Sequence, residues 1–287
     1  MPAQLIALLT AIFYASALVS ARLGLKHSTP ATVTCVSVIV QTVTLWAAIF
    51  LTGGIPPVSR AAVLLFVIVG VTQLGVRLLA YTGVHKIGAS RSSALQATSP
   101  LIAAGIAIVF LHEKPGAAVI LGTILVVTGI ILVSWRAEEH IATFRWWHLL
   151  FPVAAACLTG INHPIRRYAL SLSNEPLFLA AVMGTASLIC FTGYLALSPA
   201  TERLIWNRKA LWPFLVTGLS ETLSILFIVT ALSIGSVVVV APLAATYPVW
   251  ALLGAILFLR DVERVNLLTI IGTLSVVTGT IAIHLGN

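Results

Sequence analysis

Charge is the scarcest property of this chain. Only 8% of its 287 residues are Asp, Glu, Lys or Arg, whereas a soluble chain is typically about 25% charged. Hydrophobic residues make up 59%, and the mean hydropathy is +1.08. This balance excludes a soluble domain and indicates an integral membrane protein, because each bilayer span needs roughly 20 mostly apolar residues.

Catalytic motifs are also missing. Aspartate occurs once, as Asp261, so a paired-aspartate metal site of the prenyl-transfer type is excluded. HExxH, GxSxG and Walker A sequences are absent, which argues against hydrolytic chemistry and against ATP as an energy source. We therefore predict that the protein is not an enzyme and that it uses no metal or other cofactor.

Cysteine and basic clusters are equally sparse. Cys35, Cys157 and Cys190 stand in apolar segments without CxxC spacing, so they read as packing residues and not as metal ligands or a disulfide framework. The net charge is +8 and the pI is about 9.9. The basic residues are scattered among the predicted loops, as is usual in membrane proteins, so we predict no nucleic-acid partner.

Long apolar runs fill most of the chain. We predict an all-α integral membrane protein of the cell (plasma or inner) membrane with ten transmembrane helices, at about 3–24, 31–53, 61–83, 89–111, 116–135, 147–169, 176–198, 211–233, 236–259 and 266–285. The first run has no basic residue before it and no small-residue cleavage site, which predicts a retained helix and not a signal peptide.

The chain repeats itself. With an offset of 148, residues 93–113 and 241–261 share nine identities in 21 positions. A second repeat follows each, Gly122-Thr123 to Thr128-Gly129 and Gly272-Thr273 to Thr278-Gly279. We predict two five-helix repeats, 3–135 and 146–286, joined by the polar segment 136–145. An odd number of helices per half implies that the second repeat is inverted in the membrane, an architecture common in secondary transporters.

These motifs resemble the EamA-type branch of the drug/metabolite transporter (DMT) superfamily. In that family, the fourth helix of each half carries a Pro and ends in an acidic residue, and a Gly-rich fifth helix follows. The matching positions are Pro100 to Glu113 with Gly122 and Gly129, and Pro248 to Asp261 with Gly272 and Gly279. The turns before the fourth helices also match, as Ile87-Gly88-Ala89-Ser90 and Ile234-Gly235-Ser236. The chain departs from the pattern in having Asp261 instead of Glu.

Two indications of orientation disagree. Loops after the odd helices contain eleven basic residues and loops after the even helices contain four, so the positive-inside rule places both termini outside. The resemblance implies cytoplasmic termini. The orientation therefore stays open at this point.

The repeated prolines have a physical reading of their own. A proline inside a membrane helix removes a backbone hydrogen bond and bends the helix. Bends at Pro100 and Pro248 would place two kinked helices beside the symmetry axis, where a cavity can open. The alternative is that both prolines only shape packing. We expect the Gly-Thr and Thr-Gly pairs to let helices approach closely.

Glu221 and Arg77 are the ionisable residues predicted deepest in the membrane. Glu221 lies near the centre of the predicted eighth helix, with Thr217 and Ser224 on the same face. A carboxylate at that depth must be paired, hydrated or protonated. The third and eighth helices are equivalent in the two halves, so we predict an Arg77–Glu221 pair across the axis. Its role is either a proton or substrate relay or a structural lock.

Further candidates for the substrate or coupling site lie on the same or equivalent helices. They are Gln73, Gln96, Ser99, Tyr14, Asn162, His163, Thr246, Tyr247 and Trp250. For His163, hydrogen bonding to a neighbouring helix is the alternative. Arg22, Arg166 and Arg167 would either attract an anionic group or anchor helix ends at the interface. Glu113 and Asp261, at the ends of equivalent helices, are either a gate or solubilising charges.

The function predicted from the sequence is secondary transport. We predict that the protein exports a small amphipathic metabolite, such as an amino acid, by alternating access, with protons as a candidate coupling ion. The solute and the lipid bilayer are its predicted partners, and it acts as a monomer or a homodimer. The alternatives are a membrane scaffold or receptor subunit, a channel, or an intramembrane enzyme.

Overall fold

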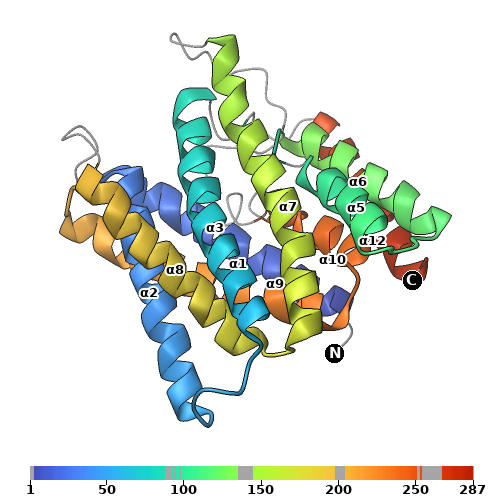
Figure 1. Cartoon of the computed structure of the whole chain (residues 1–287). Helices are drawn as coiled ribbons and strands as arrows, with labels where there is room; N and C mark the ends of the chain where they lie inside the picture. The colour runs from blue at the N-terminus through green and yellow to red at the C-terminus, as the bar shows by residue number, and fades with distance from the viewer. Residues whose placement is uncertain are drawn as a thin grey trace.

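The computed structural model describes residues 3–87, 92, 95–96, 98–134, 145–197, 204–250, 253 and 267–286. All regular secondary structure in these residues is helical (Figure 1), so the prediction of an all-α chain is confirmed. In chain order the helices are α1 (Ala3–Leu25), α2 (Pro30–Leu51), α3 (Arg60–Ile87), α5 (Ser99–Phe110), α6 (Ala117–Ser134), the 3₁₀ helix η1 (Trp146–Leu149), α7 (Leu150–Leu172), α8 (Pro176–Leu197), α9 (Arg208–Ile234), α10 (Val237–Ala244) and α12 (Leu267–Leu285).

Five of these helices are long and apolar enough to cross a membrane, judged by length and composition. The qualifying segments are Ala3–Leu25, Pro30–Leu51, Arg60–Ala80, Pro176–Ala196 and Arg208–Ile234. Shorter apolar helical segments are Ser99–Phe110, Ala117–Val133, Val237–Trp250 and Ile270–Leu285. The chain is therefore rich in apolar helices, while the total of ten spans stays a prediction.

Helix starts follow local sequence. Thr29 precedes α2, and its side chain accepts a hydrogen bond from the backbone N–H of Thr32, while Pro30 takes the first helical position. Asn207 caps α9 in the same way through Lys209. Such caps satisfy backbone donors that a helix start leaves unpaired, and proline there loses nothing because its missing N–H would have had no partner.

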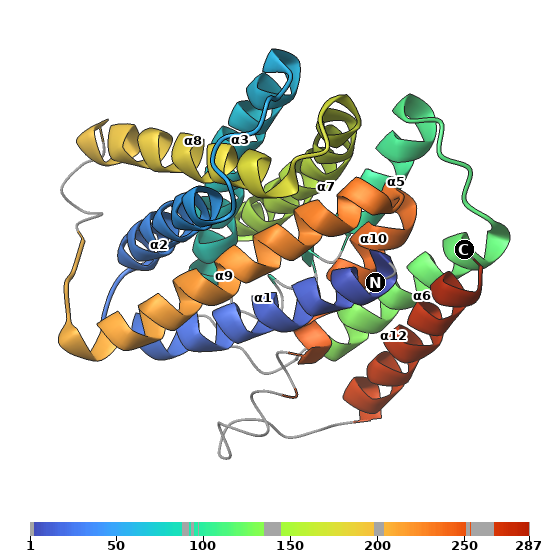
Figure 2. The same cartoon turned by 90° about the horizontal axis from the view of Figure 1, so that it is seen from below.

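The helices pack in a pattern that is preserved when the two halves are exchanged. The α1–α9 contact corresponds to α7–α3, and the α2–α9 contact corresponds to α8–α3. Two further pairs, α2–α8 and α6–α12, correspond to themselves. In both views α2 and α8 lie at one end of the molecule and α6 and α12 at the other (Figures 1 and 2). An approximate two-fold relation between the halves follows.

The repeated glycines lie where α6 meets α12. A Cβ added to Gly122 would lie 2.6 Å from the carbonyl oxygen of Gly279, and one added to Gly129 would lie 2.6 Å from that of Gly272. The reverse contacts are equally short, at 2.6 Å for Gly279 and 2.7 Å for Gly272. The two helices are antiparallel and in backbone contact, so only glycine fits at these four positions.

A second pair of equivalent glycines brings α3 and α9 close to the helices that face them. A Cβ on Gly70 of α3 would lie 2.5 Å from the carbonyl oxygen of Met183 on α8. Its equivalent on α9, Gly218, would meet Val40 of α2 at 2.8 Å. Both contacts draw α3 and α9 against the facing helices just before the polar residues Gln73 and Glu221.

The chain breaks its helical path at equivalent threonines. A turn at Thr98 precedes α5, and a turn at Ala245 and Thr246 follows α10 before helical geometry resumes at residues 247–250. The hydroxyl of Thr98 donates to the carbonyl of Leu95 at 2.7 Å, and that of Thr246 to Leu243 at 2.8 Å. Pro100 and Pro248 stand two residues further on, in the first turn of the new segment, where a missing N–H costs little. Each break therefore lies at the threonine and not at the proline.

Candidate functional site

A buried ion pair joins α3 to α9 at the centre of the molecule. Nη2 of Arg77 lies 3.3 Å from Oε2 of Glu221, and both side chains are only 5% exposed. It is the one ion pair within the described ranges. The contact that the sequence predicts is therefore present, and its role stays a prediction. Removing either partner would leave a buried charge uncompensated.

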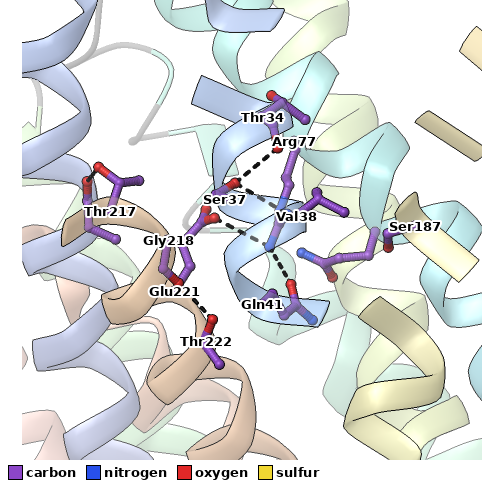
Figure 3. A network of polar contacts seen from close by, with 12 residues as sticks. Thr34, Ser37, Val38, Gln41, Arg77, Ser187, Thr217, Gly218, Glu221 and Thr222 are labelled. Atoms are coloured by element: carbon purple, nitrogen blue, oxygen red, sulfur yellow. Dashed lines mark hydrogen bonds and ion pairs between the residues drawn. The ribbon is translucent and has the colours of Figure 1, made fainter. Parts of the chain in front are cut away.

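Helix α2 holds the other side of the Arg77 guanidinium. Nη2 donates to Oε1 of Gln41 at 2.9 Å, and Nη1 donates to the hydroxyl of Ser37 at 3.5 Å. Ser37 itself donates to the carbonyl of Thr34 at 3.3 Å. Figure 3 shows Gln41 and Glu221 approaching the guanidinium from different helices. Arg77 is thus bound by groups from both halves of the chain.

The polar stripe predicted beside Glu221 faces α1. Ser224 donates to the carbonyl of Thr10 at 3.0 Å, and Thr217 donates to the carbonyls of Pro213 and Ala17 at 2.9 and 3.4 Å. These hydroxyls use neighbouring backbone carbonyls, so they fix the rotation of α9. This rotation directs Glu221 toward Arg77.

A second arginine, Arg166, lies inside the bundle on α7. Its Nη2 donates to Oε1 of Gln73 at 2.7 Å and contacts the sulfur of Met183 at 3.6 Å. The residue is only 4% exposed, so interfacial anchoring is the wrong interpretation for Arg166. One turn earlier, the side-chain oxygen of Asn162 accepts a 2.7 Å hydrogen bond from Thr72.

The neighbouring Arg167 has a different role. Its Nη1 donates to the carbonyls of Leu232 and Ser233 at 2.8 and 3.1 Å, at the end of α9. A cation is stabilised at a helix C-terminus, where backbone carbonyls lack partners. The charge of Arg167 is therefore bound within the protein. The side chain of Arg22 lies outside the described part of the structure.

The buried centre carries an excess of positive charge. Among the described residues, the buried side chains of Asp, Glu, Lys and Arg are those of Arg77, Arg166 and Glu221. Glu221 balances Arg77, while Arg166 is near enough to Arg77 for their charges to interact. One positive charge is left without an acidic partner among these residues. Burying such a charge is costly unless a ligand compensates it.

Unsatisfied polar atoms gather in the same region. Five buried side-chain atoms in the described part of the chain have no hydrogen-bond partner: Gln41 Nε2, Asn162 Nδ2, His163 Nδ1, Arg166 Nε and Glu221 Oε2. Buried polar groups are nearly always paired, so a cluster of exceptions calls for a functional explanation. The cluster is drawn from α2, α7 and α9, around the ion pair.

Most of the other candidates lie close to this centre or along the axis. The rings of Tyr14 and Tyr247 meet edge to face at 4.7 Å, joining α1 to the segment after α10. Tyr14 is within electrostatic range of Glu221 and Arg77. Ser99 and Thr246 are buried at the helix breaks. Gln96 instead bonds locally to Ser92, and Trp250 is 36% exposed, outside the buried cluster.

Glu113 contacts the other half of the chain through backbone groups. Its two carboxylate oxygens accept hydrogen bonds from the N–H groups of Val237 and Val238 at 2.9 and 3.0 Å, which begin α10. His112 has a positive φ of 54°, which turns the chain after α5. The carboxylate is therefore an N-terminal cap between halves, favoured by the helix dipole. Asp261 lies outside the described residues.

The described residues also form an apolar groove. A groove of about 310 Å³ lies over α2, α3 and α8, lined by Trp46, Val67, Val71, Val182, Thr185, Ala186, Ile189 and Cys190. It contains no charged residue and none of the candidate residues. No group of His, Cys, Asp and Glu that could hold a metal ion occurs in the described parts of the chain.

The α2 side of this site was not predicted from the sequence. Ser37 and Gln41 stand one helical turn apart, separated by apolar residues, and Gln41 is 1% exposed. An amide within an apolar helix was a usable signal, because such a group must find a partner in lipid. Their link to Arg77 depends on the crossing of α2 and α3, which sequence spacing does not give.

Comparison with solved structures supports the fold. A chain titled only "Crystal structure of protein" superimposes with a TM-score of 0.79 at 14% identity, over 99% of this chain and 96% of its own length. That similarity shows the fold alone. No curated protein matches this sequence. The family described as the EamA-like transporter family matches twice, over residues 1–135 and 145–285. The chain therefore belongs to the EamA-like transporter family, a family of integral membrane transporters.

Proposed function

We propose that this protein is a secondary transporter that exports a small amphipathic metabolite, such as an amino acid, across the cell membrane by alternating access. The observation that carries the proposal is the buried charged cluster between the halves. Arg77 and Gln41 come from the first repeat, while Glu221 and Arg166 come from the second. Charged groups enclosed in a membrane protein typically mark a substrate or ion path.

The symmetry of the packing supports an inverted repeat with ten spans. Glycine contacts between α6 and α12 are reciprocal and antiparallel, as expected when a two-fold axis in the membrane plane relates the halves. Transporters of this kind bind solute between the repeats near the bilayer centre. Here the cluster residues are at most 8% exposed, so a solute reaches them only when helices separate.

We assign Glu221 the coupling role. Protonation would remove its negative charge and weaken its contact with Arg77, which would then be free to bind another acceptor. Arg77 from α3 pairs with this carboxylate, and Tyr14 from α1 is within electrostatic range of it. Gln41 from α2 binds Arg77, and Arg166 from α7 is within electrostatic range of Arg77. Return of the proton to solution would restore the pair. Such a cycle links solute binding to proton movement.

Glu113 is assigned to the gate. Its carboxylate ties the end of α5 to the start of α10, so it holds two broken helices from different halves together. Separation of the halves on this side requires both hydrogen bonds to break. By the repeat, Asp261 is proposed to act at the equivalent place.

The test is transport by purified protein in liposomes that contain a pH-sensitive dye, with a panel of amino acids and small metabolites. Solute-dependent proton movement that disappears in Glu221→Gln supports the coupled carrier. Solute exchange with no proton movement supports transport but not proton coupling, and leaves Glu221 as a structural partner of Arg77. If no member of a broad metabolite panel exchanges, the transport proposal fails.

A further inference from the structure

We infer that Arg166 binds a carboxylate group of the solute, so that the protein selects carboxylate-bearing solutes over their neutral and amine analogues. This inference rests on the proposed function and deepens it by naming the substrate class.

The net charge of the buried cluster favours an anionic group beside Arg166. The buried cluster holds two arginines and one carboxylate, and that carboxylate pairs with Arg77. Arg166 contacts only neutral groups among the described residues, the amide oxygen of Gln73 and the sulfur of Met183. A monoanionic group brought beside Arg166 would make the centre neutral. A cationic solute there would add a second uncompensated charge.

Most of the buried atoms without a hydrogen-bond partner are donors. Gln41 Nε2, Asn162 Nδ2 and Arg166 Nε are all N–H donors without a partner, whereas the one obligate acceptor, Glu221 Oε2, already lies against Arg77. The fifth atom, His163 Nδ1, can donate or accept according to its tautomer. Three free donors need acceptor oxygens. A carboxylate offers two oxygens with about four lone-pair sites.

The arrangement of Arg166 and Asn162 on α7 suits a carboxylate. Nη2 of Arg166 is occupied by Gln73, while Nε is unpaired and buried. Asn162 lies four residues before Arg166 on α7, so the two side chains project from the same face of the helix. A planar guanidinium donates to a carboxylate along one edge, with geometry that a point charge such as Lys does not reproduce. The Asn162 amide then provides a further donor one turn away.

The adjacent Arg167 differs from Arg166 in how fully its guanidinium is bound. These adjacent residues share the same helix, yet Arg167 is bound to two backbone carbonyls at the end of α9. A merely structural arginine in this fold therefore finds its acceptors within the chain. Arg166 has an accepting partner on one nitrogen and a free donor on another.

The experiment measures binding to the purified protein, separately from transport. The probes are matched sets: leucine, 3-methylbutylamine, isovalerate and the neutral isovaleramide, together with phenylalanine, phenethylamine, phenylacetate and the neutral phenylacetamide. Calorimetry and the shift in melting temperature report binding to wild type, Arg166→Gln and Arg166→Lys. Arg208→Gln is the matched control, because it makes the same change at an exposed position.

We expect carboxylate-bearing probes to bind wild type and Arg208→Gln, and amides and amines to bind at least about 30-fold more weakly, as for loss of one partner of a buried charge pair. Arg166→Gln should lose this preference, with Arg166→Lys intermediate. The unliganded Arg166→Gln protein should melt no lower than Arg208→Gln, since the new amide can still donate to Gln73. Three outcomes would overturn the inference. They are binding to wild type that does not depend on the carboxylate, a preference for carboxylates in Arg166→Gln as large as in wild type, and a melting temperature of unliganded Arg166→Gln below that of Arg208→Gln.

Failure of this inference is distinguishable from failure of the proposed function. Transport of amides or amines in liposomes, with Arg166→Gln as active as wild type, leaves a transporter that does not recognise a carboxylate. Carboxylate binding that depends on Arg166, without any transport in liposomes, supports the site and removes the transport proposal.

Discussion

Gln73 and Glu221 occupy equivalent positions of the two repeats, 148 residues apart, and each accepts a contact from a different arginine. Gln73 binds Arg166 at 2.7 Å, and Glu221 pairs with Arg77 at 3.3 Å. Each lies three residues after a glycine, Gly70 or Gly218, that draws its helix against the facing half. The two repeats therefore place a polar side chain at the same position, which is a neutral amide in the first repeat and a carboxylate in the second. One side of the axis holds an amide and the other holds an acid.

The first prediction concerns Glu221→Gln, which makes the two sides chemically alike. Proton movement coupled to solute should fall to the level of protein-free liposomes, because no other carboxylate is buried in the described part of the chain. Solute exchange that does not require a net proton should persist. Dye-reported proton flux and radiolabelled exchange measure the two quantities separately.

Glu175→Gln is the control for that variant. Glu175 is exposed before α8, so the same loss of charge there should leave both flux and exchange unchanged. Normal proton flux in Glu221→Gln would remove Glu221 from the coupling mechanism.

The second prediction concerns the stability of the ion pair. Arg77→Gln and Glu221→Gln should each destabilise the protein by about 3 kcal/mol, since each leaves a buried charge unpaired. The double variant should lose clearly less than the sum, because the remaining groups are neutral amides that can bond to one another. Melting temperatures of wild type and of the three variants in detergent form the cycle. Additive losses would mean that the pair contributes no coupling energy.

The sequence predicted the helical class, the repeat and the Arg77–Glu221 contact. These follow from local apolar runs, from identity at a fixed offset and from equivalent depth of the third and eighth helices. Such properties belong to single helices or to the relation between copies. They need no knowledge of how the helices cross.

The surroundings of the ion pair could not be predicted in this way. Gln41 reaches Arg77 where α2 meets α3, and Arg166 reaches Gln73 where α7 meets α3. These crossings, and the close approach of α9 to α2 and of α3 to α8 at Gly218 and Gly70, are properties of the packed bundle. Arg166 and Arg167 are identical in type and adjacent in sequence. Their opposite environments depend on the rotation of α7, which periodicity in an apolar helix with several polar residues does not determine.

The third prediction concerns the Glu113 cap. Glu113→Ala removes two charge-assisted hydrogen bonds from the start of α10, at a cost of about 1–2 kcal/mol. The amides of Val237 and Val238 should then exchange hydrogen for deuterium faster, at least about fivefold for the lower figure, while α12 is unchanged. Mass spectrometry of the peptide that covers residues 236–244 measures this. Unchanged exchange would show that the cap does not hold the halves together.

The last prediction concerns the α6–α12 contact. Gly122→Ala and Gly279→Ala each place a Cβ 2.6 Å from a backbone oxygen of the opposite helix. Neither side of the contact can yield by rotating a side chain, so the helices must separate, at an expected cost of about 1–3 kcal/mol. Gly105→Ala and Gly193→Ala are matched controls, because an added Cβ at either meets nothing within 4 Å. Both controls should instead gain up to about 1 kcal/mol from helix propensity. Thermal melts of the four variants compare them directly. If the contact variants melt with the controls, α6 and α12 are not held at backbone distance, and the glycine repeat has another origin.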